Sequence, residues 1–74
     1  MTQHEFLTEM QDVLQRDEPL SMDMALADIE EWDSLAIMGT AAFMSHNFSV
    51  TMSMDDFKQL RTIADIAAKA GVFA

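Results

Sequence analysis

Apolar residues near the start of the chain recur at the three- and four-residue spacing of one helix face, and they are Phe6, Leu7, Met10, Val13 and Leu14. Thr2 and Glu5 have the spacing of a capping box, in which a hydroxyl and a carboxylate satisfy two free backbone donors at a helix start. The pattern predicts a helix that begins at Thr2 and ends near Gln15.

The helical period does not continue through residues 16–33, where Pro19 lacks an amide donor and disfavours helical geometry at Glu18. This stretch predicts a long loop, either without helix or with one short helical turn. A structureless loop of that length is unusual in a small domain. We therefore expect some of its apolar side chains to pin it to the core, from among Leu20, Met22, Met24, Leu26 and Ile29.

A second helix is predicted over residues 34–45, with either Asp33 or Ser34 as its N-cap. Its apolar positions are Leu35, Ile37, Met38, Ala41, Ala42 and Met44. Gly39 lowers the intrinsic helix propensity by about 1 kcal/mol relative to Ala, so packing must compensate. Residues 46–53 then alternate apolar and polar side chains as a strand does, but the chain offers no second strand to pair with. We expect an extended loop there.

Ser53 and Asp56 have the capping-box spacing again, with the shorter Asp in place of Glu. They predict a short third helix that includes Phe57 and Leu60.

Thr62 and Asp65 repeat the same spacing and predict the start of a last helix. Its apolar face consists of Ile63, Ile66, Ala67 and Ala70. Gly71 is a suitable stop, because glycine takes the left-handed conformation without a side-chain penalty. The sequence thus predicts an all-α fold of four helices in a single domain, residues 1–74, with a long loop after the first helix.

The composition excludes several kinds of chemistry. The 74 residues contain no cysteine, so the chain has no disulfide, no thiolate metal ligand and no cysteine nucleophile, and we expect a reducing, cytoplasmic setting. The first residues lack the positive start and apolar stretch of a signal peptide. There is also no run of eighteen or more apolar residues, so we expect no membrane span.

Charge is abundant and unevenly placed. The formal net charge of −9 opposes binding to nucleic acid or to an anionic membrane, so partner surfaces should be basic. Residues 34–54 contain no Asp, Glu, Lys or Arg. Residues 17–33 contain no Lys or Arg but many acids, which are Asp17, Glu18, Asp23, Asp28, Glu30, Glu31 and Asp33.

A self-contained active site is not evident, because the chain has neither cysteine nor tyrosine and no glycine-rich loop. We expect both histidines, His4 and His46, to be solvated surface residues, since nothing in the sequence supplies an orienting carboxylate. The acidic stretch lacks the central glycine of a calcium loop. We therefore expect no catalytic residues and no metal site.

Ser34 has two interpretations. A serine that precedes an apolar helical run is ordinarily an N-cap, and the pattern alone favours that role. A hydroxyl at a helix start also faces free amides and the positive end of the helix dipole, which suit a phosphate joined to its oxygen. Asp33 beside it either holds a divalent cation of a modifying enzyme or caps the helix.

Three segments, taken in order, resemble the acyl carrier protein family, and the resemblance extends over residues 3–71. Residues 26–35 (LADIEEWDSL) are similar to the family's attachment segment. Residues 48–50 (FSV) stand where the family has Phe-Gly-Val or Phe-Gly-Ile, and residues 60–66 (LRTIADI) resemble the start of its last helix. Asp-Ser-Leu alone is a weak match, but three matches in order are specific.

The resemblance implies a four-helix bundle with a long loop between helices 1 and 2. It implies that a phosphopantetheinyl transferase moves 4′-phosphopantetheine from coenzyme A onto Ser34, flanked by Asp33 and Leu35. The thiol of this arm would hold an acyl or aminoacyl group as a thioester. The chain would then be a monomeric carrier, not an enzyme, that serves loading and transferring enzymes of lipid, polyketide or specialised biosynthesis.

The second helix departs from the family pattern, because no acid follows Asp33 within it. Attraction of basic partners would then depend on the acids just before the helix, which are Asp28, Glu30, Glu31 and Asp33. We expect Leu35 and Met38 to make apolar partner contacts, although Met38 is equally suited to core packing.

The departure argues against ordinary fatty-acid synthase partners. Residues 30–32 are more like those of free-standing carriers in specialised pathways. Trp32 either packs the loop down or flanks the arm, and we expect packing. The alternative function is an acidic helical interaction module in which Ser34 is only an N-cap.

Overall fold

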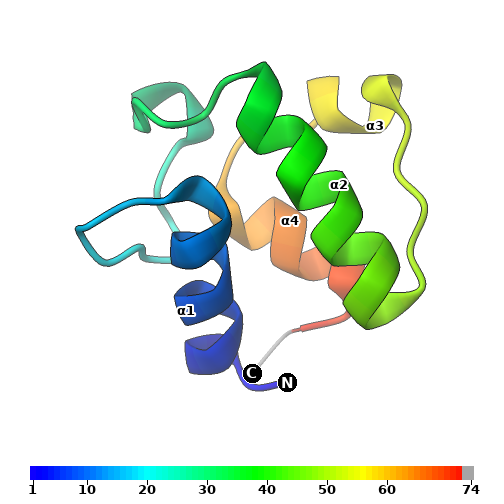
Figure 1. Ribbon diagram of the computed structural model, residues 1–74, viewed down its shortest axis with the longest axis horizontal. Coiled ribbons are helices and arrows are strands. Elements are labelled where there is room, and N and C mark those ends of the chain that lie inside the picture. The colour runs from blue at the N-terminus through cyan, green and yellow to red at the C-terminus, as the bar shows by residue number, and fades with distance from the viewer. Residues whose placement is uncertain (73–74) are drawn as a thin grey trace.

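The computed structural model describes residues 1–72 and contains four α-helices (Figure 1). The predicted domain, residues 1–74, therefore extends two residues beyond the described part. The helices are α1 (Gln3–Leu14), α2 (Ser34–Phe48), α3 (Met54–Lys58) and α4 (Ile63–Ala70), and a 3-10 turn, η1 (Leu26–Asp28), lies between α1 and α2. The described residues form no strand, only an isolated bridge between Ala25 and Thr62. The prediction of an all-α, four-helix fold is confirmed.

Three of the helices begin at the capping boxes that the sequence predicts. At α1 the Glu5 N–H donates to Thr2 Oγ1 over 3.1 Å, and the Thr2 N–H donates to Glu5 Oε1 over 2.9 Å. Ser53 with Asp56 starts α3 in the same reciprocal way, and Thr62 with Asp65 starts α4. Gly71 ends α4 in the left-handed conformation, with a φ of 78°.

The C-terminal end of α2 differs from the prediction. The helix continues to Phe48, so residues 46–48 are helical and not extended, and Ser49 ends it with a φ of 56°. Phe48 is held there by aromatic contacts, with ring centroids 6.4 Å from Phe6 and 5.6 Å from Phe43. The alternation over residues 46–53 thus reflects partial burial of apolar side chains, not a strand.

The third helix is shorter than predicted. It ends at Lys58, with Gln59 as its C-cap, and Leu60 lies in the turn that follows. The chain leaves the helical path after Lys58, and the Arg61 carbonyl accepts a hydrogen bond from the Leu26 N–H over 2.8 Å. This bond to the first loop is not compatible with a continued α3. The assignment of Leu60 to α3 was therefore wrong.

The long first loop is attached to the start of α4, as the cyan and orange segments of Figure 1 show. The Ile63 N–H donates to the Met24 carbonyl over 3.1 Å, and the Ala64 N–H donates to the Met22 carbonyl over 2.8 Å. Three apolar side chains of the loop are buried, those of Leu20, Leu26 and Ile29. The loop is thus ordered by the core, which confirms the predicted pinning.

The core lies where α1, α2 and α4 meet. Its completely buried apolar side chains come from all three helices, and they are Phe6, Met10, Met44, Ile63, Ile66 and Ala67. Burial of each large apolar side chain contributes roughly 1.5–3 kcal/mol. The hydrophobic effect therefore fixes α2 against α1 and α4, and with it the position of the residues at its start.

Candidate functional site

Ser34 is the first residue of α2. Figure 1 shows this helix in green, with its N-terminal end uppermost. Its side chain is exposed, and among the described residues its hydroxyl makes no hydrogen bond. A serine in this position is accessible to a modifying enzyme. Its oxygen can be substituted without breaking an interaction of the described fold.

Asp33 caps α2. Its backbone is extended, with φ −129° and ψ −172°, and its Oδ1 accepts a hydrogen bond from the Ala36 N–H over 2.9 Å. An N-cap residue has this non-helical backbone, whereas Ser34 is already helical. The interpretation of Ser34 as the N-cap is therefore wrong. The Asp33 carboxylate also stands at the positive end of the helix dipole, which stabilises it.

The first turn of α2 leaves backbone donors free. The Ala36 N–H is taken by the Asp33 side chain, and the Ile37 N–H donates to the Asp33 carbonyl over 2.9 Å. Within the described residues, the N–H groups of Ser34 and Leu35 have no acceptor. These two donors and the helix dipole favour an anionic group joined to the Ser34 oxygen.

Leu35 and Met38 form an apolar pair on the outer surface of α2. They are 75% and 68% exposed, although large apolar side chains are usually buried. They are three residues apart and so lie on the same helix face. The opposite face carries the buried residues Ala36, Thr40 and Phe43. The exposure of Met38 rules out the alternative that it packs in the core.

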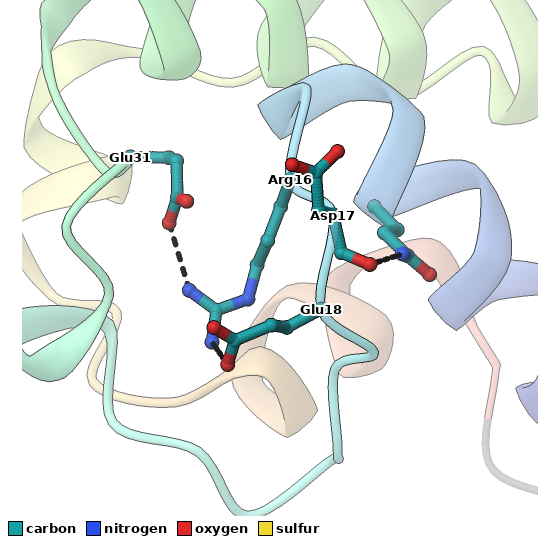
Figure 2. Close-up of polar contacts among 5 residues, drawn as sticks. Arg16, Asp17, Glu18 and Glu31 are labelled. Carbon is teal, nitrogen blue, oxygen red and sulfur yellow. Dashed lines mark hydrogen bonds and ion pairs between the residues drawn. The ribbon is translucent and has the colours of Figure 1, made fainter.

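The acids ahead of Ser34 are in different situations. Asp28 and Glu30 are exposed, and no ion pair involves them within residues 1–72. Glu31 is instead paired with Arg16, whose Nη1 lies 2.8 Å from Glu31 Oε1 (Figure 2). A hydrogen bond from its own backbone amide, and then the Arg16 guanidinium, lower the pKa of Glu31. Its carboxylate is therefore ionised and already partnered.

The Arg16 ion pair joins the end of α1 to the segment that precedes Ser34. The Arg16 side chain is only 14% exposed, and its Nη2 also lies 3.6 Å from Glu18 Oε2. Nearby, the Gln11 side-chain amide donates to the Asp17 carbonyl over 3.1 Å (Figure 2). The sequence analysis did not predict the ion pair between Arg16 and Glu31. The available sign was that Arg16 is the basic residue bordering the acidic stretch.

Trp32 connects the same segment to α3. Its ring centroid lies 6.3 Å from that of Phe57, at an interplanar angle of 43°. The Trp32 side chain is half-buried, and Phe57 is buried. Such aromatic pairs contribute about 0.5–1.5 kcal/mol beyond the area they bury. The interpretation of Trp32 as a packing residue is confirmed.

Two hollows are relevant to the site. One of about 300 Å³ lies between the end of α1 and the start of α2, and its wall includes Asp33 and Leu35 but not Ser34. A larger one, of about 580 Å³, lies along the turn between α3 and α4 and is lined by residues 59–61, 65, 68 and 69. Of these two hollows, only the smaller one is lined by residues of the attachment segment.

Other kinds of site find no support in the described part of the chain. His4 and His46 are both exposed, as predicted. Residues 1–72 contain no cluster of three or more potential metal ligands. None of the helices described is long and apolar enough to cross a bilayer.

Comparison with known proteins agrees with this geometry. A family model described as a phosphopantetheine attachment site matches residues 4–69. The match covers most of the chain and includes the start of α2, where the exposed hydroxyl of Ser34 lies. No curated protein and no solved structure matches the chain.

Proposed function

The chain belongs to the phosphopantetheine-attachment family, and from that premise we propose that Ser34 carries the 4′-phosphopantetheine arm. Members of this family are carriers with a covalently attached 4′-phosphopantetheine, not enzymes. The assignment rests on the different roles of Asp33 and Ser34 at the start of α2. Asp33 caps α2, which leaves the exposed hydroxyl of Ser34 free for attachment.

The residues around Ser34 fit such a group. The free N–H groups of Ser34 and Leu35 suit the phosphate oxygens, and the dipole of α2 stabilises the negative charge. Asp33 fixes the first turn through the Ala36 N–H and so holds the Ser34 oxygen at the helix end. The Asp33 carboxylate repels a phosphate, so we assign it to the helix cap and not to direct contact with the arm.

We propose that the cargo is an acyl or aminoacyl group. The arm supplies a thiol, which the chain's own residues lack, and so allows thioester formation. Attachment raises the local concentration of the cargo at each enzyme that binds the carrier. The protein would in this way pass one tethered substrate between enzymes of a biosynthetic pathway.

A carrier domain interacts with a phosphopantetheinyl transferase and with biosynthetic enzymes. We propose that the exposed pair, Leu35 and Met38, makes the apolar contact with these partners. Asp28 and Glu30 would attract basic partner surfaces, since both are exposed and unpaired in the described structure. Glu31 contributes less, because its carboxylate is held by Arg16.

Intact-mass measurement tests the attachment. The purified protein is incubated with coenzyme A and a phosphopantetheinyl transferase of broad specificity. We expect the wild type to gain the mass of one arm and Ser34→Ala to gain none. Ser45→Ala is the matched control, because Ser45 is another exposed serine of α2, and it should be modified like the wild type.

Two results would contradict the proposal. One is the absence of any mass gain in folded wild-type protein. The other is a mass gain that persists in Ser34→Ala. The alternative, an acidic interaction module, predicts no covalent change in any of the three proteins. The position of the cap on Asp33 weakens that alternative, since it relied on a capping role for Ser34.

A further inference from the structure

We propose that Met38 is an oxidation site through which a peroxide weakens the binding of this carrier to its partner enzymes. The inference rests on the proposed function, because it concerns the apolar partner contact assigned above to Leu35 and Met38. The peroxide converts the Met38 thioether into a sulfoxide. Because this side chain lies on the surface of α2, its oxidation alters partner binding and leaves the fold intact.

The methionines of the chain differ widely in their access to solvent. Met10 and Met44 are 0% exposed and belong to the core, whereas Met38 and Met54 are 68% and 60% exposed. Access to solvent decides which side chains a dissolved oxidant reaches first. The chain contains no cysteine, so no thiol of its own consumes the peroxide. Mild oxidation should therefore modify Met38 and Met54 before the two core methionines.

Met38 lies one helical turn from the attachment point. It is four residues after Ser34 in α2, and residues at that spacing share a helix face. It also forms the exposed apolar pair with Leu35. An enzyme that adds the arm to Ser34 has to approach this part of α2. The oxidised side chain then lies within the contact surface of that enzyme.

Oxidation changes the polarity of this surface. The sulfur lone pair attacks one oxygen of hydrogen peroxide and the O–O bond breaks. The proton of the transferred oxygen moves to the departing hydroxide, which leaves as water, so the sulfur is oxidised by two electrons and the peroxide is reduced. The resulting sulfoxide is polar and is costly to bury against apolar side chains. Since α2 has no Asp, Glu, Lys or Arg, no ionic contact along the helix compensates.

The fold does not depend on the Met38 side chain. The core-facing positions of α2 are Ala36, Thr40, Phe43 and Met44. A sulfoxide at Met44 would place a polar group in the core and lower stability. A sulfoxide at Met38 remains in contact with water. The difference in exposure thus separates an effect on binding from an effect on folding.

Transfer of the arm onto oxidised protein tests the proposal. The unmodified protein is treated briefly with hydrogen peroxide, and catalase removes the peroxide before coenzyme A and the transferase are added. Fragmentation mass spectrometry locates each sulfoxide, and circular dichroism verifies the fold. We expect oxidation of Met38 to lower kcat/KM for transfer about tenfold, which is typical for loss of one central interface contact. A methionine sulfoxide reductase with a dithiol, which releases the oxygen as water, should restore the rate.

A matched pair of leucine variants separates Met38 from the other strongly exposed methionine of the helices. Leucine is an apolar side chain of similar size that cannot form a sulfoxide. Each protein is compared with its own untreated sample. Peroxide should leave kcat/KM of Met38→Leu at its untreated value. Met54→Leu, which alters α3, should lose as much on treatment as the wild type does.

The outcomes separate this inference from the proposed function. An untreated protein that accepts no arm overturns both. A protein that accepts the arm at the same rate before and after oxidation of Met38 overturns the oxidation site alone. An equal loss in Met38→Leu and wild type would also overturn it, as would a loss that disappears in Met54→Leu. So would the appearance of a sulfoxide at Met44 before one at Met38.

Discussion

Separate replacement of Asp33 and Ser34 by alanine should distinguish the capping residue from the attachment residue. Asp33→Ala removes the acceptor of the Ala36 N–H and leaves that donor without a partner in the first turn of α2. Ser34→Ala removes a hydroxyl that makes no hydrogen bond among the described residues. We therefore expect Asp33→Ala to lower stability and Ser34→Ala to abolish attachment without lowering stability.

The magnitudes follow from the contacts of each side chain. Loss of an N-cap costs about 0.5–2 kcal/mol, which we expect for Asp33→Ala. In a domain of this size, 1 kcal/mol corresponds to roughly 4–8 °C in Tm. Asp33→Asn keeps a capping oxygen but loses the charge at the helix dipole, so it should cost only about 0.3–1 kcal/mol. Ser34→Ala should stay within about 0.5 kcal/mol of the wild type, because alanine has the higher helix propensity.

Urea and thermal unfolding, followed by circular dichroism, measure these differences. The experiments need moderate salt, because removal of an acid from a chain of net charge −9 also relieves repulsion, and salt screens that effect. A loss of stability in Ser34→Ala as large as that in Asp33→Ala would refute the assignment of the cap to Asp33. That assignment is also refuted if Asp33→Asn is no more stable than Asp33→Ala.

Three further predictions concern other parts of the molecule. Thr40 is completely buried and its hydroxyl has no hydrogen-bond partner within residues 1–72, so Thr40→Val should raise the free energy of unfolding by about 1 kcal/mol, as measured by urea unfolding. Hydrogen bonds from the Arg61 and Thr62 amides lower the pKa of Asp65, so its stabilising effect is present above its ordinary value of 3.8 and is lost as the pH falls through the lowered value. The stability difference between wild type and Asp65→Asn should therefore shrink below about pH 4 and vanish in stronger acid. Glu30→Lys should slow association with a basic partner at low salt more than Glu9→Lys does, and high salt should reduce the effect on stopped-flow rates.

The helix starts could be predicted from sequence because each depends on residues three apart. Thr2, Ser53 and Thr62 each pair with an acid in the next turn, and the structure contains all three reciprocal bonds. The end of α2 could not be predicted in this way. It depends on the contact of Phe48 with Phe6, which lies on another helix, and on Ser49, which takes a left-handed conformation that serine rarely adopts.

At the site, the order of the segments predicted where attachment should occur, but not which residue caps the helix. Aspartate and serine are both good N-caps, so the sequence alone left Asp33 and Ser34 as alternatives. The backbone conformation decides between them, since only Asp33 is extended. The Arg16–Glu31 pair was not predictable either, because its partners are fifteen residues apart and the loop between them has no repeating pattern.

The acids before α2 differ in whether their carboxylates are already bonded within the fold. The difference decides which of them can attract a partner to a helix that has no charged residues of its own. Asp33 is used by the cap and Glu31 by Arg16, so Asp28 and Glu30 are the acids of this segment left for attraction of a partner. Exposed charges at the edge of an interface mainly raise association rates, whereas buried apolar contacts set the lifetime of a complex. Leu35 and Met38 can supply that apolar contact without acids along the helix. Partner affinity should then depend on the exposed pair, and its salt dependence on the two acids beside the attachment site.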